Sequence, residues 1–181
     1  GGQSLFGGDV AMTAEPGGDA AAETFRWEIF LRGGNRTHPE IEHRGDVRKG
    51  EPRQDFGSPD GIYLDRRGVL WVQTDVSSST INSGPYSGMG TNQLMAVDPS
   101  TKEVRRFLTG PNGCEVTGIT QTPDGRTMFV NIQHPGERPD DTPSIPASPL
   151  STWPANAHGR PRSATVMIQR KDPSDERAIG E

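Results

Sequence analysis

Residues 57–75 read GSPDGIYLDRRGVLWVQTD, and this stretch decides the fold of the chain. Apolar residues gather in two short runs, at 62–64 and 69–72, and the segment 65–68 between them has the composition of a tight turn. The stretch therefore predicts a β-hairpin. One carboxylate lies at its entrance, Asp60, and another at its exit, Asp75.

The same design returns at residues 115–134, which read EVTGITQTPDGRTMFVNIQH. Gly61 and Gly118 begin the equivalent strands and lie 57 positions apart. Propeller units recur at roughly 40–50 residues, and one long connection accommodates the difference. Two hairpins at this pitch, the first entered at Asp60 and the second at Glu115, favour adjacent blades of a β-propeller.

Further strands are predicted by alternating or continuous apolar runs at 24–31, 93–98, 103–108 and 163–170. No segment has a convincing helical period. Residues 60–108 thus contain four strands in a row, which is the antiparallel meander of one blade. We predict an all-β fold, a partial β-propeller of two to three blades, preceded by an irregular connection at 1–24. The blades are expected to occupy residues 25–172, and a tail to occupy residues 173–181.

Composition agrees with short strands joined by long loops. Only 30% of the 181 residues are hydrophobic, while the chain contains 23 glycines and 16 prolines. The long loops are expected at 32–53, 76–90 and 135–161. The net charge of −5 gives no reason to expect nucleic acid or an anionic membrane as a partner, and no apolar run is long enough to span a bilayer.

Asp60 and Glu115 are the first candidates for chemistry. Both are predicted to precede the innermost strand of a blade, and carboxylates from adjacent blades that point at one axis would form an oxygen-rich site for calcium or another hard cation. Asp60 has an alternative explanation, because Ser-Pro-Asp-Gly is also ordinary turn sequence. Glu115 has no comparable local role, since nothing in Gly-Cys-Glu-Val requires a carboxylate.

Asp75 and His134 are second-rank candidates, because each follows directly on the second strand of its hairpin. Histidine can ligate a metal, donate a proton or bind phosphate, although a histidine beside a Pro-Gly turn is also a common packing residue. Cys114 could be a soft ligand, but a small buried residue is the simpler interpretation. As a single cysteine it forms no internal disulfide. The sequence contains no phosphate loop, no paired cysteines and no nucleophile elbow.

Several segments resemble one known family. The segments SPDGIYLDRRGVLWVQTD (58–75), NQLMAVDP (92–99), GCEVTG with FVNIQHPGE (113–118 and 129–137) and PRSATVMIQRKD (161–172) are similar to the C-terminal part of PhoX-type alkaline phosphatases. These are secreted bacterial phosphomonoesterases. The similarity extends over most of residues 25–172.

The resemblance implies a six-bladed parent propeller that needs calcium, with an iron centre in the same channel, and that acts on phosphomonoesters. It also implies twin-arginine export to the periplasm or the cell exterior, and we expect a monomer. Asp60 and Glu115 then look like metal ligands. Much of the family's iron ligation and phosphate binding lies outside these residues, so the chain is expected to be a C-terminal fragment that is inactive alone.

Two other functions are compatible with the sequence besides the phosphatase. Calcium-dependent propeller lactonases and esterases of the gluconolactonase type share the PDG…G.LWV hairpin, so this motif does not separate them from phosphatases. The third possibility is a non-catalytic binding propeller in which the acidic residues hold a structural calcium. GCEVTG and NIQHPG favour the phosphatase.

Overall fold

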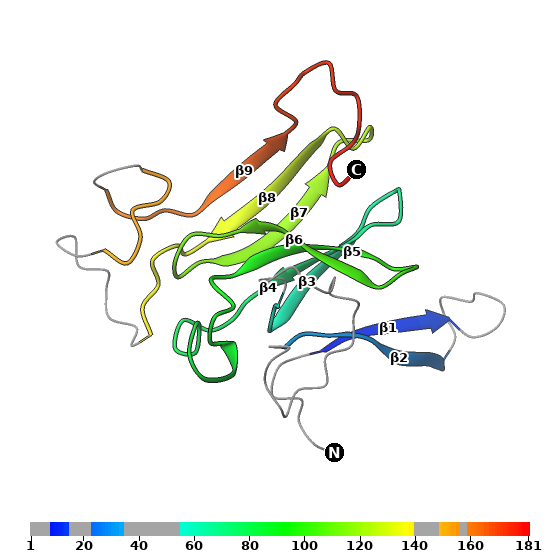
Figure 1. Ribbon diagram of the computed structural model, residues 1–181, viewed down its shortest axis with the longest axis horizontal. Helices are drawn as coiled ribbons and strands as arrows, with labels where there is room; N and C mark the ends of the chain where they lie inside the picture. The colour runs from blue at the N-terminus through cyan, green and yellow to red at the C-terminus, as the bar shows by residue number, and fades with distance from the viewer. Residues whose placement is uncertain (1–7, 15–22, 35–54, 140–148, 156–158) are drawn as a thin grey trace.

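A computed structural model describes residues 8–14, 23–34, 55–139, 149–155 and 159–181 of the chain. These residues form nine β-strands and a single turn of 3-10 helix at Gly84–Tyr86. The strands make three antiparallel sheets that follow one another along the chain (Figure 1). The all-β prediction is confirmed. Most of the predicted loop at 32–53 lies outside the described residues, as do the parts 140–148 and 156–158 of the predicted loop at 135–161.

The three sheets differ in size. The first contains β1 (Gly8–Ala14) and β2 (Phe25–Arg32). The second contains β3 (Pro59–Leu64), β4 (Leu70–Thr74), β5 (Gln93–Asp98) and β6 (Glu103–Thr109), in that order. The third contains β7 (Glu115–Gln121), β8 (Thr127–Gln133) and β9 (Ala164–Gln169). The second sheet is the four-strand meander predicted for residues 60–108.

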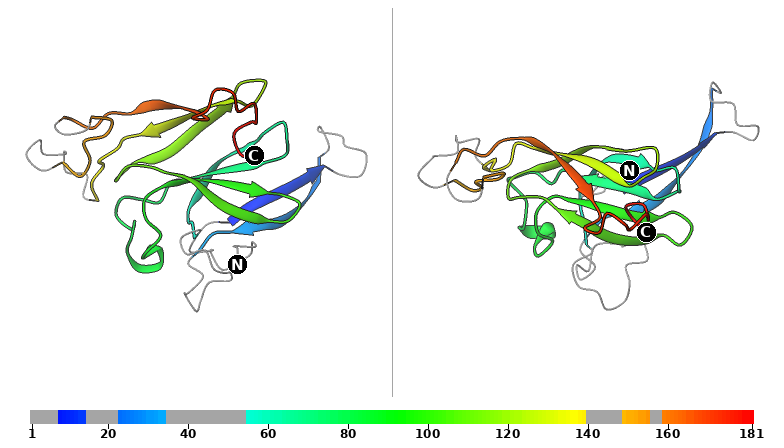
Figure 2. Two further views of the ribbon diagram at one scale, coloured as in Figure 1. Left: turned by 45° about the horizontal axis from the view of Figure 1, so that its top comes forward. Right: turned by 90° about the horizontal axis from the view of Figure 1, so that it is seen from above.

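The second sheet lies between the other two and is covered on both faces (Figure 2). Towards the first sheet, Val72, Met95 and Val97 pack with Leu31 and Phe56. Towards the third sheet, a separate core forms from Trp71, Leu94, Val116, Met128, Val130 and Ile132. Since alternate residues of a strand point to opposite faces, burial on both faces explains why β4 reads as the unbroken run Leu-Trp-Val.

Both inner hairpins contain a glycine at a β-bulge. The register of β3 on β4 shifts between Pro59 and Ile62, and that of β7 on β8 shifts between Thr117 and Ile119. A side chain at Gly61 would collide with the Gln73 amide, and one at Gly118 with the Asn131 amide. Gly118 also has a φ of 49°, which favours glycine. The sequence repeat is therefore a repeat of structure.

The turn between β3 and β4 is organised by the buried carboxylate of Asp65. Its Oδ1 accepts hydrogen bonds from the backbone N–H groups of Arg67 (2.9 Å) and Val69 (3.0 Å). Its Oδ2 accepts from Trp71 Nε1 and from the Arg67 guanidinium, both at 3.1 Å. Burial by itself would raise the pKa of Asp65, but these hydrogen bonds hold that pKa below its ordinary value.

Asp65→Asn is expected to lower the free energy of unfolding by about 1–3 kcal/mol, because an amide cannot accept all of these hydrogen bonds. Since the folded-state pKa is lowered, the charged carboxylate stabilises the protein above the unfolded-state pKa near 3.8, and this contribution is lost as pH falls through the folded-state value. Urea unfolding at neutral and acidic pH measures both effects. Asp98→Asn is the control, because Asp98 is an exposed turn carboxylate. An equal loss in the two variants would contradict this role of Asp65.

Two expectations for the ends of the chain were wrong. Residues 1–24 were predicted to be irregular, but Gly8–Ala14 form β1. Its backbone groups pair with β2, and this pairing requires no apolar pattern. The predicted tail at 173–181 is partly in the core, because Ala178 and Ile179 are buried and the Ile179 N–H donates to Gly125 O at 2.9 Å. The boundaries proposed at 24/25 and 172/173 remain predictions.

Candidate metal centre

The four residues singled out from the sequence lie at one edge of two adjacent sheets. Asp60 is the second residue of β3, and Asp75 follows directly on β4. Glu115 is the first residue of β7, and His134 follows directly on β8. In an antiparallel hairpin the start of one strand and the end of its partner share an edge. Because β7 contacts both β3 and β4, the two edges adjoin.

His134 links two carboxylates. Its Nε2 lies 3.4 Å from Glu115 Oε2, and its Nδ1 lies 3.6 Å from Glu137 Oε2. The backbone of His134 has a φ of 36°, in the left-handed region that non-glycine residues rarely adopt. Its N–H donates to Ser163 Oγ at 3.0 Å, which ties the start of the loop to the third sheet. The imidazole is thus held between two acids.

Glu137 was not predicted from the sequence. It comes within reach of His134 because the Pro-Gly turn brings residue 137 back, with the Glu137 N–H donating to His134 O at 3.2 Å. The turn also docks on the loop before β7, through Gly136 N to Asn112 O (2.8 Å) and Glu137 N to Gly113 O (3.1 Å). The only local signal is the spacing of three residues after a histidine.

Asp75 is at the centre of the negative charge. Burial of part of this otherwise exposed carboxyl is the largest cause of a raised pKa, followed by repulsion from Glu115. Asp60 and Glu137 raise the pKa further, while His134 opposes them. All four predicted residues therefore interact electrostatically, and we call Asp60, Asp75, Glu115, His134 and Glu137 the acidic edge cluster. Such a concentration of carboxylates attracts a cation.

Asp75→Asn is expected to stabilise the metal-free protein at neutral pH. A raised folded-state pKa means that Asp75 costs no stability below pH 3.8 and destabilises the fold once the pH exceeds the folded-state value. The amide removes this repulsion. Thermal unfolding of chelator-treated protein should therefore give a higher Tm for the variant at pH 7, and this gain should disappear at acidic pH. A lower Tm at pH 7 would show that the negative charge of Asp75 is needed for folding.

Asn92 connects the chain segments that carry the cluster. It is a buried residue directly before β5 and was not predicted from the sequence. Its Oδ1 accepts hydrogen bonds from Val76 N (2.7 Å) and Thr74 Oγ1 (3.0 Å). Its Nδ2 donates to Cys114 O (2.8 Å) and Val76 O (3.0 Å). Asn92 therefore fixes the residues on both sides of Asp75 and the residue before Glu115.

The buried position of Cys114 agrees with its predicted role as a packing residue. It is buried, and Gly110 lies so close that a side chain there would collide with its sulfur. Burial is the main cause that raises the pKa of the Cys114 thiol to about 12, with smaller contributions from Glu115 and Asp75. The thiol is therefore protonated at neutral pH.

Two details of the predicted site require correction. Asp60 and Glu115 lie within their strands and not before them. They are also not equivalent: Glu115 pairs with Gln133, whereas the matching place in the first hairpin is held by Ser58, whose carbonyl accepts from Asp75 N at 3.0 Å. The glycine pitch places Thr117 in the position of Asp60, so the second blade carries its acid two residues earlier.

The side chains of the cluster do not form a complete metal site in the described part of the chain. Across the described ranges, no group of three or more His, Cys, Asp or Glu side chains is arranged to hold a metal ion. The metal-ligand roles of Asp60, Glu115, Asp75 and His134 therefore stay predictions. No helix among the described residues is long and apolar enough to cross a membrane.

The fold and this edge define a class: a propeller fragment with acids where inner strands of adjacent blades begin and end. Residues 5–136 match the family described as alkaline phosphatase PhoX, and the chain belongs to that family. It is similar to the solved structure described as "Pseudomonas fluorescens PhoX in complex with vanadate, a transition state analogue", with a TM-score of 0.74 and 37% identity. The match covers 97% of this chain and 28% of that chain. Comparison with curated proteins gave no match.

The comparison confirms the family resemblance and the partial propeller. It does not favour the lactonase or the non-catalytic binding propeller, because the family that matches the chain is described as an alkaline phosphatase family. The chain spans just over a quarter of the relative's length, as the 28% coverage shows.

Proposed function

We propose that this chain is part of a metal-dependent phosphomonoesterase that releases inorganic phosphate from phosphate monoesters. The observation that carries the proposal is the acidic edge cluster in a chain of the PhoX family. A relative with 37% identity is described in complex with vanadate, a transition state analogue. Vanadate resembles the phosphoryl group during transfer, so this relative supports phosphoryl chemistry.

Calcium fits the donors of the cluster. Its preferred ligands are oxygens, and Asp75, Glu115 and Asp60 supply carboxylate oxygens at one edge. Burial is the largest cause of the raised pKa of Asp75, and repulsion from the neighbouring carboxylates adds to it; a bound divalent cation would offset that repulsion. We propose Glu115 and Asp75 as the principal ligands, with Asp60 and His134 at the margin. The described residues do not present a set of ligands for iron, so the iron expected from the family is assigned no residue here.

The residues of the cluster have separable roles. Glu115 and Asp75 bind the cation, which when bound neutralises charge on the phosphoryl oxygens and activates the attacking oxygen. His134 lies against Glu115 at Nε2 and orients that carboxylate, while the Glu137 carboxylate lies 3.6 Å from Nδ1, on the other side of the ring. Without a cation these carboxylates repel a phosphate dianion. Activity should therefore depend strictly on metal.

The remaining expectations are also proposals. The substrate is a phosphomonoester bound in a channel that further blades complete, which is supported by the 28% coverage of the relative. We propose that the protein is exported by the twin-arginine route, acts in the periplasm or outside the cell, and is a monomer. These three points follow from the family.

A comparison of substrates tests the proposed reaction. The full-length, metal-replete protein is given 4-nitrophenyl phosphate, 4-nitrophenyl acetate and a simple lactone, and initial rates are compared. The proposal expects rapid release of nitrophenol from the phosphate ester alone. Faster turnover of the lactone or the acetate would overturn it in favour of an esterase, and no turnover of any substrate would favour a binding propeller.

A further inference from the structure

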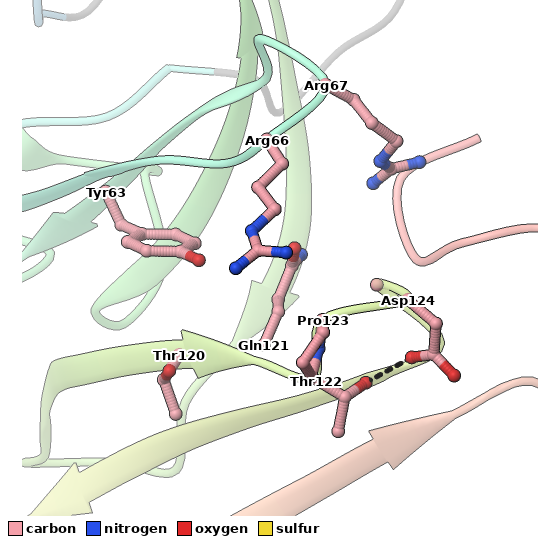
Figure 3. A pocket seen from close by; sticks show the side chains of 9 residues that line it. Tyr63, Arg66, Arg67, Thr120, Gln121, Thr122, Pro123 and Asp124 are labelled. Atoms are coloured by element: carbon pink, nitrogen blue, oxygen red, sulfur yellow. Dashed lines mark hydrogen bonds between the residues drawn. The ribbon is translucent and has the colours of Figure 1, made fainter.

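A cavity of about 290 Å³ lies at the opposite end of the inner strands from the acidic edge cluster. It is enclosed by the β3–β4 turn, which contributes Arg66 and Arg67, and by the β7–β8 turn at residues 122–125. Tyr63, Thr120 and Gln121 form its wall on the inner strands (Figure 3). The acidic edge cluster lies where β3 and β7 begin, whereas the cavity lies at the turns that follow these strands. The two are separated by the length of a strand, so the cavity is distinct from the proposed metal centre.

Two side chains of the cavity, Gln121 and Arg66, have hydrogen-bond donors without an acceptor in the described part of the chain. Gln121 Nε2 is buried and has no hydrogen-bond partner among the described residues. The Arg66 guanidinium extends over the cavity beside Gln121 and the phenol of Tyr63 (Figure 3), and no other described residue forms an ion pair or hydrogen bond with it. A buried N–H group without a partner is rare in folded proteins and requires an explanation. Here a cation and a buried amide converge on one space.

The other charged side chains of the cavity, Arg67 and Asp124, already have ion-pair or hydrogen-bond partners. Arg67 contacts Asp65 Oδ2 at 3.1 Å and Glu181 Oε1 at 3.2 Å, and it also donates to the carbonyl of Ile179. The carboxylate of Asp124 accepts hydrogen bonds from Thr122 Oγ1 (2.6 Å) and Arg126 N (3.0 Å). In Figure 3 Asp124 lies on the far side of its turn from Tyr63. Arg66 is therefore the charged side chain of the cavity that has no hydrogen-bond or ion-pair partner among the described residues.

We propose that this cavity is an oxyanion-binding site, in which Arg66 and Gln121 Nε2 are the principal donors and Tyr63 and Thr120 contribute hydroxyl groups. A guanidinium presents several N–H groups in a fork that matches a phosphate or a carboxylate. The volume is at or below the lower limit of organic ligand sites, about 300 Å³, so the ligand is a small anion. The site goes beyond the proposed function and does not depend on it.

Calorimetric titration with inorganic phosphate tests the site. The full-length protein is stripped of metal and then freed of chelator, so that the acidic edge cluster repels phosphate and contributes no binding. The titration is repeated with succinate, which distinguishes phosphate from carboxylate as the preferred anion. The variants are Arg66→Gln and Gln121→Leu. Arg160→Gln is the matched control, because Arg160 is an exposed arginine outside the cavity.

The expected result is binding of at least one of the two anions by the wild type and by Arg160→Gln, with affinity reduced about tenfold or more in Arg66→Gln. Gln121→Leu should also weaken binding. The site is refuted by absence of binding for both anions, or by equal affinities in the wild type and Arg66→Gln. Because metal is absent throughout, failure of the phosphatase proposal would leave this result unchanged, and the reverse also holds.

Discussion

Replacing Asn92 by leucine is expected to lower the free energy of unfolding by about 3–5 kcal/mol, because several buried polar groups lose their partners at once and breaking a buried network is among the mechanisms with large effects. Leucine has a similar shape but makes none of the four hydrogen bonds that Asn92 makes with Thr74, Val76 and Cys114. The N–H and C=O groups of Val76 and the C=O of Cys114 would each lose a partner. A buried polar group that loses its partner costs about 1–3 kcal/mol. Urea unfolding monitored by tryptophan fluorescence measures the change.

The loss should extend to the proposed metal centre. Val76 and Cys114 adjoin Asp75 and Glu115, so movement of either backbone displaces a proposed ligand. Calcium affinity of Asn92→Leu should therefore fall under conditions where the variant is still folded. Asn112→Leu is the control, because Asn112 is exposed and its side chain has no hydrogen bond among the described residues. Equal stability of the two variants would show that Asn92 does not join the two blades.

Glu115→Gln is expected to weaken calcium binding and phosphatase activity by about 100-fold or more, because loss of a group that merely orients a metal ligand already costs 10–100-fold. Glutamine keeps the size of the side chain and removes the charge that faces both Asp75 and His134. Asp60→Asn should have a smaller effect, since Asp60 acts on Asp75 less strongly than Glu115 does. Calcium titration and steady-state rates on the full-length protein measure both variants.

The control for charge removal is Glu176→Gln. Glu176 is exposed and lies in the loop after β9, away from the acidic edge cluster. This variant should bind calcium and turn over substrate like the wild type. If Glu115→Gln behaves in the same way, Glu115 is not a ligand. In that case its contact with His134 would be an ordinary surface ion pair, which contributes little to stability.

Strand positions were predictable because the apolar pattern is local. The hairpins at Asp60 and Glu115, the outer hairpin and β9 all contain apolar runs bounded by turn residues, and each forms where it was predicted. The strand β1 was missed because its pairing with β2 uses backbone groups, which leave no pattern in the side chains. The burial of Ala178 and Ile179 was missed because this short segment reaches the core through a long-range backbone hydrogen bond to Gly125, which leaves no pattern in the sequence.

Part of the proposed site was also predictable from the local apolar pattern of the hairpins. Asp75, Glu115 and His134 stand at strand ends, so the hairpin pattern alone brings them to one edge. Glu137 depends on how the Pro-Gly turn folds back, and Asn92 depends on contacts between blades. Neither feature is encoded in the periodicity of a strand. Asp60 and Glu115 were matched because each is the acid at the entrance of its hairpin, but they lie one and three residues before Gly61 and Gly118, so the repeat matches Glu115 with Ser58 and not with Asp60.

The central claim is that the acidic edge cluster binds a cation required for phosphate ester hydrolysis. The most direct measurement is a calcium titration of chelator-stripped, full-length protein, followed by the rate of 4-nitrophenyl phosphate hydrolysis. We expect no activity without metal and a saturable recovery with calcium in the wild type. In Glu115→Gln this recovery should require about 100-fold more calcium or a still higher concentration. Full activity after complete removal of metal, or identical calcium curves for the wild type and Glu115→Gln, would contradict it.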